Sequence, residues 1–427
     1  MRYIYSIVLL VCTMNLVAQN GDFQNHFKDG SLRMDVYHCG NKDTSDYYFD
    51  KFMIEKYWGG PQANLLENFG YGTNMVKVRD KISGKVIYSY SYCTLFQEWQ
   101  TTSEAANINR CYEESVSVPL PVRESVVEIY LRNKHGKFDK VFSQDYNPDE
   151  IYVMKEHKYD FDVYDVAVNG AAPDKVDVVI IPDGYTLEEM DKFKSDCQNL
   201  VNVFKKFEPY SSAFSDFNFR AVLAPSDDSG TDVPRKNIWK RTIVDAHFDT
   251  FYSDRYNTTD SYFAVKDVAS CVPYDQIYIL VNSNIYGGGG IYNYYSVSTA
   301  GNISSDKVII HEFGHAFAGL GDEYVEPGTS FDDMYGKDME PWEPNLTTLI
   351  DFASKWQALV DKNTPVPTIP QEKYIDKTGV FEGAGYVEKG VYRPAYDCLM
   401  RTFNGNTFCE VCTKAIKKMI DFRTGKQ

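Results

Sequence analysis

The sequence predicts an α+β protein, with an N-terminal β-sandwich over residues 20–155 and an α/β domain over residues 156–427. Three observations lead to this prediction. The chain of 427 residues is too long for one small hydrophobic core. Segments rich in β-branched and aromatic residues dominate the first third of the chain. From about residue 165, short apolar runs alternate with amphipathic helical patterns.

The predicted sandwich has its clearest strands at 86–92 and 125–131. Both segments are rich in Val, Ile and Tyr and are bounded by turn-forming residues. No long stretch with helical periodicity interrupts this region. Nothing in its sequence resembles a catalytic group of residues.

The α/β pattern begins with a buried strand predicted at 178–181, which Pro182 and Gly184 end. Thr186 and Glu189 form a capping-box signature that opens a helix. The apolar positions of this helix follow helical spacing: Leu187, Met190, Phe193, Cys197, Leu200, Val201 and Phe204. Further strands are predicted at 219–223 and 276–281. The glycines at 287–290 predict a flexible turn that leads into an edge strand over 291–295.

The first residues have the pattern of a secretory signal peptide over residues 1–19, because Arg2 precedes a short apolar run at 4–11. Cleavage near Gln19 would place the mature chain outside the cell, in the periplasm or at the cell surface. A lipoprotein anchor at Cys12 is the weaker alternative, because Val11 precedes that cysteine. No later segment has 18 consecutive apolar residues, so no transmembrane span is expected.

The charge and cysteine content limit the partners and the compartment. A formal net charge of −16 argues against a nucleic-acid partner, which would require basic patches. Cleavage of the signal peptide removes Cys12 and leaves an even number of cysteines in an oxidising compartment, where disulfides are expected.

A candidate metal site lies in a predicted helix that begins near Ser304. His311 and His315 are four residues apart, so both side chains project from one helix face and can reach a single Zn²⁺ at about 2.0–2.1 Å. Glu312 projects beside them and can take a proton from water on the metal. The alternative is a pair of satisfied core histidines, and the motif alone occurs by chance in roughly one such chain in a hundred. The apolar residues around the motif favour the metal site, because burying these groups without an ion is costly.

A set of short motifs in both halves of the chain matches one family of proteins. In the catalytic half the matching segments are Ser229-Gly230-Thr231-Asp232, His311-Glu312-Phe313-Gly314-His315, Asp322-Glu323-Tyr324, Phe381-Glu382-Gly383-Ala384-Gly385-Tyr386, Tyr392-Arg393-Pro394, Asp397-Cys398-Leu399-Met400-Arg401 and Phe408-Cys409-Glu410-Val411-Cys412. In the N-terminal half they are Tyr92-Cys93-Thr94-Leu95-Phe96 and Glu98-Trp99-Gln100-Thr101-Thr102. In these motifs the chain resembles the IgA peptidase family of zinc metallopeptidases. The resemblance implies peptidase activity, a metzincin-like α/β catalytic domain and an N-terminal accessory β domain. It does not imply immunoglobulin as the substrate.

The third metal ligand departs from the usual metzincin pattern, because Ala318 and Gly321 replace its glycine and its third histidine. No histidine follows His315, so a carboxylate is expected. Asp322 is the first carboxylate after a turn that Gly319 permits. Glu323 is the alternative ligand, or it orients a ligand histidine without touching the metal.

Three further features have open interpretations. The resemblance to metzincins implies that Met400 lies in a tight turn beneath the metal, although an ordinary core methionine is the alternative. The cysteines at 398, 409 and 412 favour disulfides over a second zinc site, because no fourth ligand is evident in the sequence. The acidic stretch 331–343, with Asp332, Asp333, Asp338 and Glu340, suggests either a structural Ca²⁺ site or a solvated loop.

The favoured function is a secreted zinc-dependent endopeptidase that hydrolyses peptide bonds in extracellular host, dietary or bacterial proteins. Gly289, Gly290 and Ile291 are expected to pair with an extended peptide or glycoprotein substrate. One alternative is a catalytically silent glycoprotein-binding protein, against which the intact Glu312 argues. A zinc amidase that acts on cell-wall peptide is the other, because its chemistry would be the same.

Overall fold

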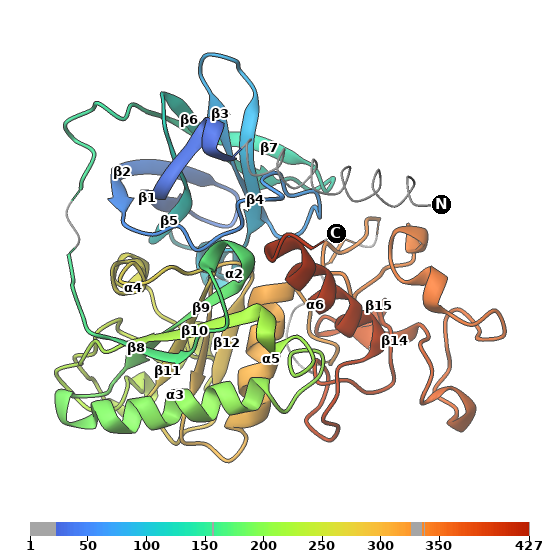
Figure 1. Ribbon diagram of the computed structural model, residues 1–427. Coiled ribbons are helices and arrows are strands. Elements are labelled where there is room, and N and C mark those ends of the chain that lie inside the picture. Colours follow the sequence, from blue (N-terminus) through green and yellow to red (C-terminus); the bar gives the residue numbers. More distant parts are fainter. Residues whose placement is uncertain (1–22, 156–157, 326–334, 337, 427) are drawn as a thin grey trace, which may run out of the picture.

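The computed structural model describes residues 23–155, 158–325, 335–336 and 338–426. A β-rich N-terminal part stands above a mixed α/β part in Figure 1. The structure therefore confirms the mixed α and β content and the β-rich N-terminal region. Within the described ranges, no helix is both long enough and apolar enough to cross a bilayer. The predicted signal peptide lies outside these ranges.

The N-terminal part consists of two antiparallel sheets with strand orders β2-β1-β5 and β4-β3-β6-β7. The strands are β1 (Phe27–Gly40), β2 (Ser45–Glu55), β3 (Asn74–Asp80), β4 (Val86–Tyr92), β5 (Arg110–Pro121), β6 (Ser125–Arg132) and β7 (Phe138–Tyr146). Alternate apolar residues of both sheets share one buried core, including Val76 of β3 and Val118 of β5. A disulfide between Cys39 and Cys111 joins β1 to β5. The strands predicted at 86–92 and 125–131 are confirmed as β4 and as most of β6.

The second part is built on a six-stranded sheet with the order β12-β13-β11-β9-β10-β8. Its strands are β8 (Val163–Ala167), β9 (Val176–Asp183), β10 (Phe217–Val222), β11 (Gln276–Val281), β12 (Gly288–Ile291) and β13 (Tyr295–Thr299). The four central strands are parallel, whereas β12 and β8 are antiparallel to their neighbours. Every residue of β9 is buried, as expected for a strand covered on both faces. The strands predicted at 178–181, 219–223 and 276–281 correspond to β9, β10 and β11.

The helices and the remaining hairpin complete the fold. They are α2 (Leu95–Gln100), α3 (Met190–Phe204), α4 (Tyr262–Ala269), α5 (Ser305–Ala318), α6 (Glu410–Arg423), β14 (Phe381–Ala384) and β15 (Val387–Arg393). The predicted capping box of Thr186 and Glu189 is confirmed, and it caps a 3₁₀ turn, Leu187–Glu189, that leads directly into α3. Leu187 lies in that turn and is exposed, whereas the later apolar positions of α3 are buried.

Helix α5 packs against α3 through aromatic rings. The ring centroids of Phe313 in α5 and Phe204 in α3 are 4.9 Å apart, and Phe317 packs against Phe217 of β10 at 5.9 Å. These rings are fully buried in the main hydrophobic core. Such packing holds α5 at a fixed position relative to the sheet.

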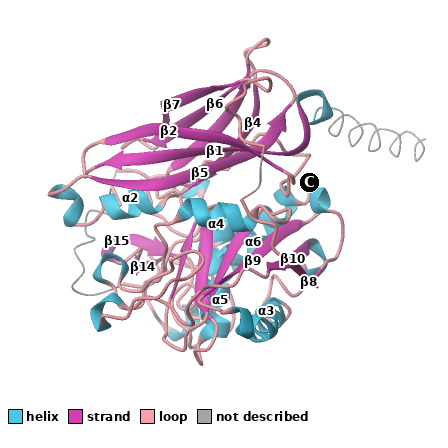
Figure 2. Ribbon diagram, turned by 90° about the vertical axis from the view of Figure 1, so that its left-hand side faces the viewer, coloured by secondary structure: helices cyan, strands magenta, loops and turns pink. Residues whose placement is uncertain are grey.

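The two parts of the chain are joined by a buried polar interface, with α2 and α4 between the sandwich and the mixed sheet (Figure 2). Arg33 of β1 donates from Nη1 to Asp267 of α4 at 2.7 Å. The backbone N–H of Cys93 donates to the carbonyl of Tyr292 at 2.8 Å, immediately before α2. The first contact joins β1 to α4, and the second holds the start of α2 against the turn that follows β12.

The glycine-rich segment differs from its prediction, because the strand and the turn are exchanged. Residues Gly288–Ile291 form the edge strand β12, and the turn follows at 292–294. A Cβ atom on Gly290 would lie 2.2 Å from the backbone oxygen of Glu312, and one on Gly289 would lie 2.7 Å from the ring of Tyr256. The glycines therefore allow close packing of β12 against α5 and the segment around residue 256, rather than flexibility.

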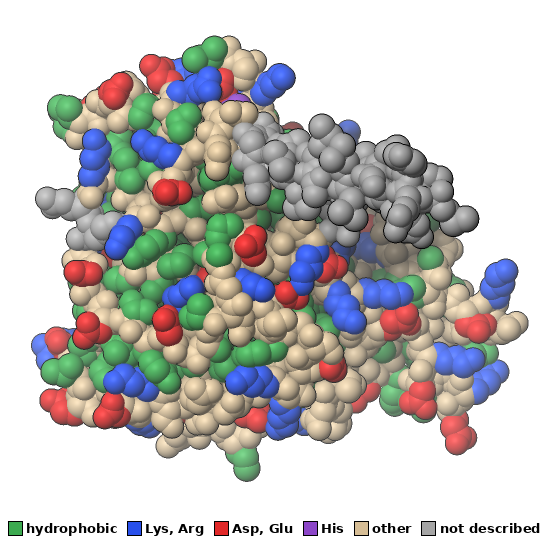
Figure 3. All heavy atoms as spheres, in the orientation of Figure 1, with side chains coloured by type: hydrophobic (Ala, Val, Ile, Leu, Met, Phe, Trp, Pro, Cys, Tyr) green, Lys and Arg blue, Asp and Glu red, His purple; other side chains and the backbone are tan. Residues whose placement is uncertain are grey.

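On the face shown in Figure 3, Lys and Arg side chains are interspersed with Asp and Glu side chains. The net charge of −16 is therefore not gathered into a single patch on that face.

Candidate active site

Helix α5 brings His311 and His315 to one face, one turn apart. The helix ends at Gly319, which adopts a left-handed conformation with φ of +63°. The N–H of Gly319 donates to the carbonyl of His315 at 3.0 Å. This left-handed C-terminal cap turns the chain back toward the histidines.

Backbone carbonyls fix the orientation of both imidazole rings. Nδ1 of His311 lies 2.9 Å from the carbonyl oxygen of Leu399, and Nδ1 of His315 lies 2.5 Å from that of Leu320. A carbonyl can only accept, so each Nδ1 carries the proton and each Nε2 presents a lone pair in the neutral ring. The two Nε2 atoms nevertheless face each other at 3.1 Å. Such an arrangement needs a cation between them.

Asp322 completes this convergence from the loop after α5. Its Oδ1 lies 3.2 Å from Nε2 of His311 and 3.4 Å from Nε2 of His315. The hydroxyl of Tyr386 donates to its other oxygen, Oδ2. Three ligands at about 2.0–2.1 Å from a tetrahedral Zn²⁺ would be separated by about 3.3–3.4 Å. The three atoms therefore have the spacing of three corners of a zinc tetrahedron.

The pKa values of His315 and Asp322 reflect how closely these charged groups approach one another. Burial by itself lowers the pKa of His315, but the carboxylates of Asp322 and Glu312 outweigh it and raise that pKa to about 9. Burial tends to raise the pKa of Asp322, and the two histidines instead hold it well below its ordinary value. A proton on His315 is the smallest cation that satisfies the cluster, and a metal ion would displace it.

Glu312 lies beside the cluster on the cleft side of α5. Burial raises the pKa of its carboxyl group, and the charges of His311 and His315 offset this only in part. A Cβ on Gly288 would lie 3.0 Å from Oε1 of Glu312, so β12 packs directly against this side chain. A carboxylate with a raised pKa is suited to take a proton from water.

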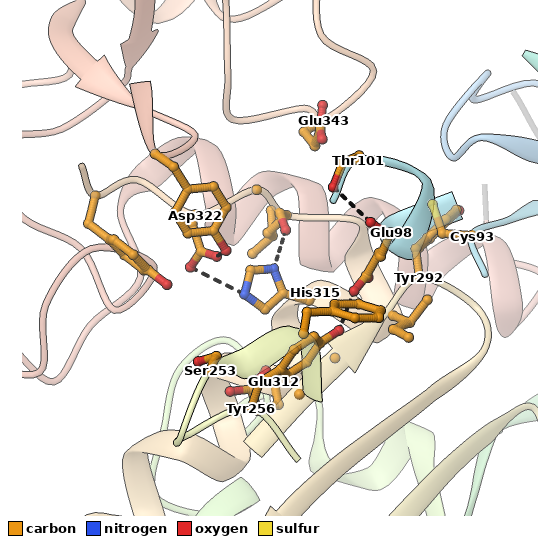
Figure 4. Close-up of a pocket in the computed structure, with 18 of the residues that line it drawn as sticks. Cys93, Glu98, Thr101, Ser253, Tyr256, Tyr292, Glu312, His315, Asp322 and Glu343 are labelled. Atoms are coloured by element: carbon orange, nitrogen blue, oxygen red, sulfur yellow. Dashed lines mark hydrogen bonds and ion pairs between the residues drawn. The ribbon is translucent and has the colours of Figure 1, made fainter. Parts of the chain in front are cut away.

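These residues line a cleft of about 1360 Å³. Its walls include β12, the loop after α5 and the N-terminal helix α2, together with Tyr256 and Tyr386. In Figure 4, His315 lies between Asp322 on one side and Glu98 on the other. The cleft is larger than a typical small-molecule site of about 300–1,000 Å³, which leaves room for a polymer.

Two family models match the chain, one in each half. A family model described as IgA Peptidase M64 matches residues 164–377 and 368–420. The chain belongs to the IgA peptidase M64 family. A second model, described as Peptidase M64 N-terminus, matches residues 22–143 of this M64 peptidase. No curated protein matches the chain.

Glu98 is a cleft residue of the M64 peptidase that sequence reasoning did not assign to the site. It comes from α2 in the N-terminal part and accepts a hydrogen bond from the hydroxyl of Tyr256. Burial raises the pKa of Glu98 to about 7, although the Tyr256 hydroxyl opposes this shift. The available signal was its place in the segment 98–102, which resembles the family, but that segment lies more than 200 residues before His311 in the sequence.

Glu323, the alternative third ligand, does not face the histidines. Its Oε1 lies 3.1 Å from Sγ of Cys412 and 3.0 Å from Nδ2 of Asn345. Met400 is fully buried, and its sulfur would lie 3.1 Å from a Cβ on Gly314, between the two histidines of α5. The backbone carbonyl of Met400 accepts from the N–H of Glu323 at 2.7 Å.

The acidic stretch considered for Ca²⁺ is only partly described, because Asp332 and Asp333 lie outside the described ranges. Glu340 accepts hydrogen bonds from the hydroxyl of Thr347 and the backbone N–H groups of Thr348 and Asp351. These bonds give Glu340 a role in holding its own loop together.

Proposed function

We propose that this M64 peptidase is a secreted zinc-dependent endopeptidase with a metzincin-like catalytic domain. One observation supports this most strongly. Nε2 of His311, Nε2 of His315 and Oδ1 of Asp322 converge within 3.1–3.4 Å, beside Glu312 in a large cleft.

The residues present fit a zinc ion. His311, His315 and Asp322 would hold it, because Oδ1 of Asp322 is buried and faces the Nε2 atoms of the two histidines. The carbonyls of Leu399 and Leu320 and the hydroxyl of Tyr386 would hold the three ligands in place. When bound, zinc would polarise the substrate carbonyl and lower the pKa of water.

Glu312 would perform the proton transfers. Its carboxylate takes a proton from the attacking water as the water oxygen bonds to the carbonyl carbon of the scissile peptide. The same carboxyl group then gives the proton to the leaving nitrogen as the C–N bond breaks. Its raised pKa makes the carboxylate a stronger base than that of an exposed glutamate.

Strand β12 would bind the substrate backbone. The segment 255–257 covers the outer edge of Gly288. The N–H of Gly288 donates to the carbonyl of Arg255, and the carbonyl of Gly288 accepts from the N–H of Asn257, both at 3.2 Å. Because successive residues of an antiparallel strand alternate in direction, the N–H and C=O of Gly290 point the same way as those of Gly288. Gly290 lines the cleft together with Gly289 and Ile291, so an extended peptide could extend the sheet there.

Two further features support the proposal. The turn at Leu399 and Met400 lies beneath His311 through the Leu399 carbonyl, which is the position expected of a methionine-containing turn below the metal. The disulfide between Cys39 and Cys111 suits an oxidising compartment, in agreement with secretion after cleavage near Gln19.

A peptide library with blocked termini tests the proposal directly. Purified mature protein should cleave internal bonds of these peptides, and a chelator should abolish the cleavage until zinc is restored. Mass spectrometry of the products would give the residue preference. Cleavage that persists undiminished after full metal removal, or the absence of any cleavage by zinc-loaded protein, would refute the proposal.

A further inference from the structure

We propose that Cys398, Cys409, Cys412 and Glu323 bind a second, structural zinc ion directly behind the active-site cleft. The ligand atoms of these four side chains all lie within 4.8 Å of one another. They come from three segments: the loop after α5, the turn at 398–400 and the first turn of α6. The site itself is independent of the proposed peptidase function.

The distances within this cluster, which we call the thiol cluster, fit a tetrahedral ion. Sγ of Cys398 lies 3.8 Å from Sγ of Cys412. Two thiolates at about 2.3 Å from one Zn²⁺ are separated by about 3.8 Å, whereas a disulfide requires about 2.0 Å. Oε1 of Glu323 lies 3.1 Å from Sγ of Cys412 and 3.9 Å from Sγ of Cys409. The corresponding sulfur–oxygen separation in a zinc site is about 3.6 Å.

Backbone N–H groups and a helix N-terminus stabilise negative charge on Cys398 and Cys409, whereas a metal ion would have to overcome the burial that raises the pKa of the Cys398 and Cys412 thiols. The backbone N–H of Cys409 points to Sγ of Cys398 at 3.3 Å, and that of Cys412 points to Sγ of Cys409 at 3.5 Å. Cys409 is the N-cap residue of α6, so its sulfur lies at the positive end of the helix dipole. Donated N–H groups and a helix N-terminus both stabilise negative charge on sulfur, which is the form that binds metal.

Glu323 gives an independent indication of a cation. It is completely buried, and its Oε2 has no hydrogen-bond partner among the described residues. Without an ion, Oε1 accepts from Asn345 and from the thiol of Cys412, while Nη1 of the neighbouring cation Arg393 donates to the carbonyls of Glu382 and Gly383 and not to Oε2. A buried carboxylate whose second oxygen has no donor is costly unless a metal ion coordinates the group.

The donor set selects the metal. Three sulfur ligands and one oxygen ligand in a tetrahedral arrangement suit Zn²⁺, whereas Mg²⁺ and Ca²⁺ require oxygen ligands. With all four groups ionised, the site has the same charge as a Cys₄ zinc site, which is a standard structural type.

The second ion would fix the geometry of the active site, an effect that rests on the proposed function. Glu323 is bonded to Asp322, and Cys398 is bonded to Leu399, whose carbonyl orients His311. The N–H of Glu323 also donates to the carbonyl of Met400. An ion in the thiol cluster would therefore tie together the loop that positions Asp322 and the turn that positions His311.

Metal analysis of the full mature chain, purified without reductant or chelator, tests the site. We expect two zinc ions per chain in the wild type, one in the His311→Ala/His315→Ala variant and one in the Cys398→Ser/Cys412→Ser variant. Cys197→Ser, which changes a buried free thiol of α3, is the matched control and should keep two. After cobalt replaces zinc, the double-histidine variant should show the near-ultraviolet absorption of thiolate–cobalt charge transfer.

The cobalt spectrum of the double-histidine variant decides the matter even if the cysteine variant fails to fold. Absence of both metal and the thiolate band in that folded variant would overturn the second site. A disulfide among the three cysteines, detected by peptide mapping of non-reduced protein, would overturn it equally. If the wild type and the double-histidine variant contain the same single zinc with thiolate ligands, the proposed catalytic site fails and the thiol cluster stands.

Discussion

Asp322 and Glu323 are adjacent in the chain, yet their carboxylates point into different clusters of potential metal ligands. Oδ1 of Asp322 faces the two histidines at 3.2 and 3.4 Å, whereas Oε1 of Glu323 faces Sγ of Cys412 at 3.1 Å. The peptide bond between them is thus a short connection between the two sites.

We expect substitutions of Asp322 and Glu323 to remove zinc from different sites. Asp322→Ala should lose the histidine-bound zinc and the activity while the thiol cluster keeps its metal, because only Asp322 completes the first set of ligands. Glu323→Ala should weaken metal binding at the thiol cluster and leave zinc on the histidines. Zinc stoichiometry of both purified variants checks this, and the opposite pattern would show that the carboxylates were assigned to the wrong sites.

Glu312→Gln should retain the fold and the bound zinc but lower kcat by about 10²–10⁴, the usual contribution of a general acid–base group. The amide keeps the shape of the side chain and cannot accept the proton of water. Rates on a quenched peptide, measured beside zinc content, separate this effect from metal loss. His311→Ala is the companion variant and should lose the metal itself. Near-normal turnover by Glu312→Gln would remove this residue from the proposed mechanism.

The raised pKa of Glu98 predicts a pH-dependent substrate preference. Because that pKa is about 7, Glu98 is neutral below pH 7 and carries a negative charge in the cleft above it. The kcat/KM for a peptide with a cationic residue, relative to its neutral analogue, should therefore rise between pH 6 and pH 8 by about tenfold, or about 1.4 kcal/mol. Glu98→Gln should abolish the rise. A rise of the same size in that variant would assign the titration to another group.

Gly290→Ala tests the close packing of β12 on α5. The added Cβ would lie 2.2 Å from the backbone oxygen of Glu312, which is a rigid neighbour. We expect a loss of about 1–3 kcal/mol in the free energy of unfolding, together with reduced kcat, because the strand or the helix must shift. Thermal unfolding and peptide kinetics measure the two effects. Gly405→Ala is the control, since its nearest contact would be an ordinary 3.7 Å from Asp397. Equal stability of the two variants would contradict the packing argument.

Local sequence patterns predicted the elements that depend on near neighbours. The spacing of His311 and His315 placed them on one helix face, and the left-handed turn at Gly319 was predicted from the glycine itself. The glycine-rich strand β12 was predicted as a turn, because glycine disfavours strands unless another backbone approaches closely. That approach involves α5, which follows β12 in the sequence. The sequence pattern likewise could not predict that Glu323 lies beside three distant cysteines, since contacts between residues far apart in the chain leave no local periodicity.

The position of α2 has a consequence for how this protein can be divided. The segment matched by the peptidase model begins at residue 164, but Glu98 and its helix form part of the cleft wall. Removing the N-terminal sandwich would take away that wall. It would also expose buried residues that pack beside α2, including Tyr292. Insertions or substitutions in the turns around α2 can thus reshape the cleft while helix α5 keeps its sequence. Changes in what the enzyme cleaves can arise in the part of the chain that contributes none of the proposed zinc ligands.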